Sequence, residues 1–211
     1  MSLIGYGAFS YCTNLTTVLL SNASLISDRA FYSCSKLTTV SLPNVSLIKD
    51  YVFCGCSKLA TVSLPNASII GLCAFSGCTN LTTILLPNVS SIAQYAFSGC
   101  TKLATVSLPN ASLIAASAFY NCTKLTTISL LTASYIAQYA FCGCTNLTTI
   151  LLSNITEPIG SYTFSKCYHL ISFYLLKNSM VNLGNMNAFL STPISTYTVS
   201  TGGKYGSIFV P

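Results

Sequence analysis

The chain of 211 residues is half hydrophobic (52%) but only 6% charged, with nine Lys or Arg against three Asp or Glu and a formal net charge of +6. No uninterrupted apolar run approaches the ~18 residues of a membrane-spanning helix, because Ser and Thr recur throughout. The basic residues are spread along the chain, whereas nucleic-acid binding requires a denser basic stripe with aromatic platforms. Composition therefore predicts neither membrane insertion nor a nucleic-acid partner.

A 22-residue repeat dominates the sequence from position 4 to position 175. It is plainest in an evenly spaced Phe column, of which only the last step is one position longer: Phe9, Phe31, Phe53, Phe75, Phe97, Phe119, Phe141 and Phe164. Ile, Cys, Leu and β-branched columns keep the same phase and begin at Ile4, Cys12, Leu15 and Val18. Such a period predicts a solenoid, in which each unit stacks on the next. We expect these columns to form the core, where each buried Phe, Leu or Ile contributes about 1.5–3 kcal/mol.

Each unit is expected to contain three elements, in chain order. The A-F-x-x-C stretch is too short for a stable isolated helix and predicts one 3₁₀ or α turn on the outer side. The L-T-T-V-S-L stretch alternates as a strand with one buried face does, and a Pro-Asn pair ends it at Pro43, Pro65, Pro87 and Pro109. The N-A-S-x-I stretch predicts a second short strand. Because stacked strands lie ~4.8 Å apart, eight units would form a rod of about 40 Å.

The repeat also predicts the domain organisation. Residues 1–176 are expected to form a solenoid of about eight units, and residues 177–211 an irregular capping segment. Asn187-Ala188-Phe189 echoes the A-F element once more after Phe164, and residues 205–211 have the pattern of a final strand. The expected fold class is a β-rich solenoid with a parallel sheet on one face and short turns or 3₁₀ helices on the other.

Two motifs carry a resemblance to a known family. The motif A-F-x-x-C-x-x-L is clearest at residues 74–81, and L-x-x-V-x-L-P-N is clearest at residues 103–110. Together they resemble BspA-like leucine-rich repeats from position 4 to position 175, in a shorter variant of a repeat that is commonly one residue longer. The resemblance implies a right-handed superhelix from a secreted or surface-exposed microbial protein. It also implies attachment to proteins of a host or of other cells, without catalysis.

The eleven cysteines would ordinarily predict disulfides or a metal site. Eight of them share one inward phase: Cys12, Cys34, Cys56, Cys78, Cys100, Cys122, Cys144 and Cys167. A spacing of about 5 Å between rungs would allow bridges, but buried Cys packs as a small hydrophobe, so free thiols are favoured. The pairs Cys54-Gly55-Cys56 and Cys142-Gly143-Cys144 should each place one thiol inward and the other outward. Their C-x-C spacing does not match a zinc ribbon, so no metal is predicted.

No catalytic arrangement is visible in the sequence. The acidic residues Asp28, Asp50 and Glu157 lie in separate units, and the single His169 has no acidic column beside it. Asp28 and Asp50 share a phase, but each has a basic neighbour, so local ion pairing is favoured over paired-carboxylate chemistry. With no glycine-rich phosphate loop either, the sequence predicts no enzyme and no cofactor.

Function is therefore expected on exposed columns. The residues that flank the β-branched position should point outward and form a nearly neutral strip of hydroxyls with occasional Leu. This candidate partner-binding strip comprises Thr17, Thr39, Ser41, Thr61, Ser63, Thr83, Leu85, Thr105, Ser107, Thr127, Ser129 and Thr149. Solenoids commonly bind partners on such a face, although Thr also simply suits a half-exposed strand.

A candidate basic edge precedes the strand Leu, at Lys36, Lys58, Lys102 and Lys124. These lysines alternate with Asn in a partial period of three units. They could attract an anionic partner, or could form a solvated edge that prevents sheet stacking. On the outer turn, a tyrosine column offers either a contact surface or half-buried packing: Tyr51, Tyr95, Tyr139 and Tyr162.

These features predict a non-catalytic protein-interaction or adhesion module, with a structural spacer that carries another domain as the alternative. A regular Thr ladder with few charges is also compatible with an ice-binding surface. The expected partner is a protein or glycoprotein on a host or neighbouring cell, the expected location is extracellular or at the cell surface, and the oligomeric state stays open. The chain begins inside a repeat without a visible signal peptide or polar cap, which favours a fragment of a longer secreted protein.

Overall fold

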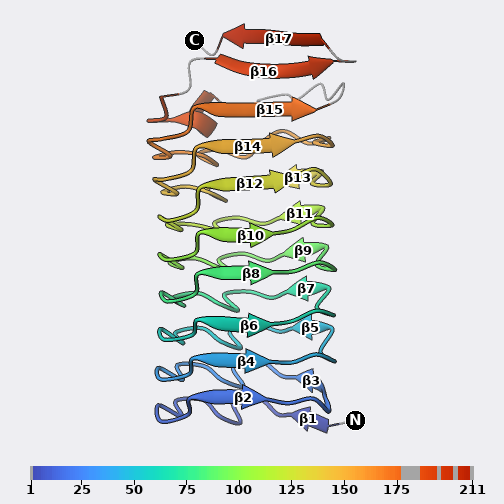
Figure 1. The fold of residues 1–211 in the computed structure, drawn as a ribbon, viewed down its shortest axis with the longest axis vertical. Coiled ribbons are helices and arrows are strands. Elements are labelled where there is room, and N and C mark those ends of the chain that lie inside the picture. Colours follow the sequence, from blue (N-terminus) through green and yellow to red (C-terminus); the bar gives the residue numbers. More distant parts are fainter. Residues whose placement is uncertain (1, 177–185, 194–195, 202–203, 210–211) are drawn as a thin grey trace.

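The computed structural model describes residues 2–176, 186–193, 196–201 and 204–209, which form a rod of stacked turns (Figure 1). Each of the first seven turns carries two short strands. One strand of each turn faces the viewer in Figure 1, and we call these the front strands: β2 (Thr17–Leu19), β4 (Thr39–Ser41), β6 (Thr61–Ser63), β8 (Thr83–Leu85), β10 (Thr105–Ser107), β12 (Thr127–Leu130), β14 (Thr149–Leu152) and, in the eighth turn, β15 (Ser172–Leu176). The predicted solenoid of about eight turns is confirmed.

The other strands form a second sheet, which confirms the predicted N-A-S-x-I strand. This sheet is continuous and parallel in the order β1 (Ser2–Ile4), β3 (Ala23–Ile26), β5 (Leu47–Ile48), β7 (Ile69–Ile70), β9 (Ser91–Ile92), β11 (Leu113–Ile114) and β13 (Tyr135–Ile136). Its register follows the repeat, so that Ile48 pairs with Ile70 and Ile70 with Ile92. Like residues therefore lie above one another along the rod.

The front strands are parallel and in the predicted register, but strand pairing divides them into three sheets. These are β2-β4-β6, β8-β10 and a third sheet that begins β12-β14-β15. Within each sheet the pairing keeps the phase of the repeat, as in Thr17 with Thr39 and Thr105 with Thr83. The expected parallel face is therefore present, but its strand pairing is interrupted between β6 and β8 and between β10 and β12.

The core is made of the predicted columns. The rings from Phe9 to Phe141 stack nearly parallel with centroids 5.2–5.5 Å apart, and those from Phe31 to Phe164 are fully buried. At the first turn Phe9 remains 39% exposed, because the stack covers only one side of its ring. Burial of like residues on successive turns stabilises the rod and sets its register.

The outer segments between the strands are turns rather than helices. Within each A-F-x-x-C stretch, amides bond to the carbonyl three residues earlier, as Ser76 does with Cys73 and Cys78 with Phe75. Two positions per unit adopt left-handed backbone: the position of Tyr51 (φ 59°) and that of Gly55 (φ 76°). This conformation explains why Gly recurs at the second position, since Gly has no Cβ penalty there.

The described part of the predicted capping segment continues the stack. The 3₁₀ helix η1 (Met186–Phe189) repeats the Ala-Phe turn, with Phe189 stacked on Phe164 at 5.3 Å. Strand β16 (Thr196–Thr201) pairs parallel to β15, and β17 (Lys204–Phe209) pairs antiparallel to β16. The predicted final strand is thus present over residues 205–209, while residues 177–185, 194–195, 202–203 and 210–211 of the proposed cap lie outside the described structure.

Candidate functional site

The candidate strip lies on the front strands with its side chains outward, as predicted. In β8 the pattern is exposed Thr83, buried Ile84 and exposed Leu85. The same alternation places the Thr and Ser members on one face, most of them exposed and Thr39, Ser41 and Thr149 half-buried. Leu85 is 59% exposed and Leu19 is 66% exposed. The strip therefore offers hydroxyls together with apolar contact area and carries no charge of its own.

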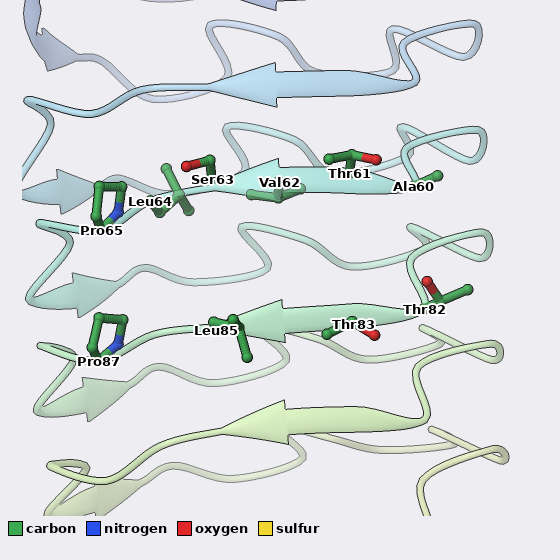
Figure 2. Close-up of a pocket in the computed structure, with 10 residues that line it drawn as sticks. All are labelled: Ala60, Thr61, Val62, Ser63, Leu64, Pro65, Thr82, Thr83, Leu85 and Pro87. Carbon is green, nitrogen blue, oxygen red and sulfur yellow. The ribbon is translucent and has the colours of Figure 1, made fainter.

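Two hollows mark the strip where strand pairing stops. The larger has a volume of about 500 Å³ and lies between β6 and β8, lined by Ala60, Thr61, Val62, Ser63, Leu64, Pro65, Thr82, Thr83, Leu85 and Pro87 (Figure 2). The smaller, of about 240 Å³, lies between β10 and β12, lined by Val106, Ser107, Leu108, Pro109, Ser129 and Leu131. Sequence reasoning missed the hollows, although the identical sequences of residues 58–68 and 102–112 were a signal for them.

The lysines of the candidate basic edge are all exposed, but they are not equivalent. The Nζ of Lys36 donates to Asn14 Oδ1 at 3.1 Å, and the Nζ of Lys102 donates to Asn80 Oδ1 at 2.7 Å. Asn thus accepts from the Lys of the following unit, which gives a physical reason for the partial three-unit period. Because Asn is neutral, each bonded lysine keeps its net positive charge.

The eight inward cysteines form a ladder of free thiols. From Cys34 onward each Sγ donates to the carbonyl of the Phe one unit earlier, as Cys78 does to Phe53 at 3.2 Å. Burial raises the pKa of Cys78, Cys122 and Cys144 well above 9.0 and that of Cys167 to about 12. These four buried thiols are therefore protonated and unreactive at neutral pH.

The C-x-C pairs follow the prediction only in part. Cys56 is fully buried and Cys54 is half-buried, as expected for an inward and an outward residue. Cys142 was expected outside but is only 6% exposed. Part of the reason is the neighbouring turn, where Ser165 is buried and its carbonyl accepts a hydrogen bond from the Gly143 amide.

Two of the three acidic residues, Asp28 and Asp50, accept hydrogen bonds from backbone amides of the next turn. Asp28 Oδ1 accepts a hydrogen bond from the Asp50 amide at 3.2 Å, and Asp50 Oδ1 accepts one from the Leu72 amide at 2.8 Å. Each carboxylate therefore links its own turn to the next, and this role, rather than the expected local ion pairing, accounts for their shared phase. The guanidinium of Arg29 lies 5.2 Å from the ring centroid of Tyr51, in cation–π contact.

The tyrosine column lies on the outer turn at left-handed positions. Tyr139 and Tyr162 stack with centroids 5.1 Å apart, and Tyr95 is partly exposed. The described residues contain no group of three or more His, Cys, Asp or Glu placed to hold a metal ion. Nor does any helix in the described ranges have the length and apolarity to cross a membrane.

Comparison with known proteins agrees with this architecture. The family described as "BspA type Leucine rich repeat region" matches residues 1–104 and 90–205 in six copies. A solved leucine-rich repeat protein from T. pallidum is 37% identical, with a TM-score of 0.62 over 68% of this chain and 69% of that one. Internalin C2 from Listeria monocytogenes, 15% identical with a TM-score of 0.50, covers 89% of this chain and 82% of its own, and shows likeness of fold alone. No significant match was found among curated proteins.

Proposed function

The chain belongs to the BspA-type leucine-rich repeat family, and we propose that it is a non-catalytic interaction module whose partner binds the candidate strip on the front strands. Leucine-rich repeat proteins generally bind other proteins. The observation that carries the proposal is the strip itself: exposed hydroxyls and Leu side chains arranged at one phase over successive front strands, interrupted by two hollows. The partner class is a protein or glycoprotein on a host or neighbouring cell.

The proposed location is extracellular or at the cell surface, where such a partner is accessible. BspA-like repeats are common in surface proteins. Few charges and many hydroxyls provide an adaptable hydrogen-bonding surface, while exposed Leu adds apolar contact area that a partner can bury. The strip contains no Asp, Glu, Lys, Arg or His, so contact there depends on hydroxyl hydrogen bonds and apolar packing.

The test compares two triple-arginine variants for binding to intact cells of a candidate host or neighbouring species. The strip variant is Thr61→Arg/Thr83→Arg/Thr105→Arg, and the matched control changes exposed residues of the second sheet: Ile69→Arg/Leu113→Arg/Tyr135→Arg. We expect the strip variant to lose at least about tenfold in binding, because central contacts of an interface carry most of its energy, and the control to bind as the unaltered rod does.

Two other outcomes would contradict the proposed binding site or the proposed role. Equal loss in both variants would place the contact elsewhere or make it nonspecific. A rod that binds no cell-surface component in any form would favour a structural spacer. Circular dichroism of each variant confirms that the rod remains folded.

A further inference from the structure

The two hollows occur at identical sequences. Residues 58–68 and 102–112 both read Lys-Leu-Ala-Thr-Val-Ser-Leu-Pro-Asn-Ala-Ser and lie two units apart. Ala60 and Ala104 stand where five other units have Thr. Strand pairing stops directly after each of these two units, between β6 and β8 and between β10 and β12. We call the two openings the notches.

Main-chain groups at each notch lack the partner that their equivalents have elsewhere. The carbonyl of Thr38 accepts from the Ala60 amide at 3.0 Å, and that of Thr82 accepts from the Ala104 amide at 2.9 Å. Across the described turns, the carbonyls of Ala60 and Ala104 accept no such bond from the unit that follows. An unpaired backbone group is a strong hydrogen-bonding site for water or a partner.

The same holds for donors at the other end of each notch. The Leu42 amide donates to Ser63 O and the Leu86 amide to Ser107 O, both at 3.1 Å. Leu64 and Leu108 occupy the equivalent position beside the notches, and no backbone bond joins their amides to the next described unit. Each notch therefore offers main-chain acceptors and donors as well as hydroxyls.

Apolar side chains form the rest of the notch walls. Val62 and Val106 are half-buried there, whereas Val40 and Ile84 at the same phase are buried. Leu85 and Pro87 complete the larger notch (Figure 2). Exposed Lys58 and Lys102 begin the two identical sequences, so the unit before each opening carries one cation outside the notch lining, and Lys102 Nζ also bonds Asn80 Oδ1 of the preceding unit.

Distance and backbone chemistry together select the conformation of an occupant. The Phe rings rise 5.2–5.3 Å per turn from Phe53 to Phe97, so the two notches lie about 10.5 Å apart along the rod. A polyproline II segment repeats its side chains every three residues, or about 9.3 Å, and leaves its own backbone groups free. A β-strand presents one face at about 6.8 and 13.6 Å. An α-helix matches the distance, at about 10.5 Å for seven residues, but its backbone is already hydrogen-bonded and cannot pair with the open main-chain groups. Polyproline II is therefore the conformation that combines free backbone groups with a repeat near the notch spacing.

We propose that the notches bind an extended, acidic polypeptide segment in polyproline II conformation, which runs along the rod and places small aliphatic side chains three residues apart. The segment's backbone pairs with the open main-chain groups and its carboxylates pair with Lys58 and Lys102. The proposal rests on the strip being the binding surface and names the chemistry of the partner there.

The probe is a fluorescein-labelled peptide of four Val-Glu-Pro copies, and binding is measured by fluorescence anisotropy. Its control has the same composition with Val moved to every second position. The notch variant is Ser63→Tyr/Ser107→Tyr, which fills both openings from exposed positions. The matched control, Ser41→Tyr/Leu151→Tyr, lies at the same phase on paired strands.

We expect the ordered peptide to bind at least about tenfold more tightly than the control peptide, and the notch variant to lose about tenfold while the matched control stays within about twofold. Lys58→Gln/Lys102→Gln should weaken binding and reduce its salt dependence. Equal binding of both peptides, retention by the notch variant, or tighter binding of a helical peptide would overturn the proposal. Strip-dependent cell binding without peptide binding would overturn only this assignment and leave the proposed function intact.

Discussion

The second sheet and the front strands arise from the same repeat, yet one is continuous and the other is divided. Beside the second sheet, a Ser in each of four successive units donates to the Ser carbonyl one unit earlier, as Ser90 Oγ does to Ser68 O at 3.2 Å. The amide of Ser90 donates to the same carbonyl at 2.8 Å. On the front strands the equivalent linking phase changes from Thr to Ala at two units, and the ladder opens after each. The front ladder thus opens after each Ala unit, whereas the second sheet keeps its Ser phase and is continuous.

The largest expected effect concerns the core that both faces share. Because burial raises the pKa of Cys78, Cys122 and Cys144 well above 9.0, the folded state keeps protons that the unfolded chain releases. Their stabilisation is fully present below about pH 9 and declines as the pH rises further, by about 1.4 kcal/mol per pH unit for each thiol. Urea unfolding between about pH 8 and pH 10.5 should show a steep loss, shallower in Cys78→Ala. A stability independent of alkaline pH would contradict thiol burial.

Removal of one ring from the Phe stack should cause the next largest loss in the free energy of unfolding. Phe97→Ala leaves a cavity between two fully buried rings and should destabilise the rod by about 3–5 kcal/mol. Phe9→Ala, at a 39% exposed position, should cost about 1–2 kcal/mol. Urea midpoints measure both. Hydrogen exchange shows whether the front strands and the second sheet open together, and independent opening would mean that the stack does not couple them.

Backbone exchange tests the division of the front strands directly. The amides of Ala60, Ala104 and Thr148 donate to the preceding unit, at 2.8–3.0 Å. The amides of Thr82 and Thr126 have no such acceptor in the described chain and should exchange about ten- to hundredfold faster. Amide-resolved hydrogen exchange by NMR makes the comparison within one molecule. Equal protection at all five positions would show a continuous front sheet in solution.

The smallest expected effect is a difference in the free energy of unfolding between variants that each lose one hydroxyl, one beside the second sheet and one on the strip. Ser90→Ala removes a hydroxyl that bonds the neighbouring turn and should cost about 0.5–1 kcal/mol. Ser107→Ala removes an exposed hydroxyl from the strip and should change the free energy of unfolding by less than about 0.5 kcal/mol. Chemical denaturation of both variants checks this difference. A larger cost at Ser107 would assign the strip a structural role.

Periodicity predicted which residues of the candidate site point outward. It did not predict individual hydrogen bonds and turn conformations, which depend on local contacts. Thr83 and Leu85 were predicted to point outward because Ile84 between them belongs to the core column, and the structure agrees. The roles of Asp28 and Asp50 were missed, since their acceptor function depends on which amide of the next turn lies within reach. The left-handed turn at Tyr51 was also missed, because Tyr carries no local signal for positive φ.

The sequence by itself determined the solenoid, its phase, the buried columns and the exposed strip. These follow from a period that repeats the same apolar pattern, so one unit's packing dictates every other. The Thr-to-Ala changes mark two units in the sequence, but only the tertiary structure showed that the front sheet opens after them, which lysines Asn contacts and where each thiol donates. Those depend on distances between adjacent turns, where a fraction of an ångström decides whether a hydrogen bond forms.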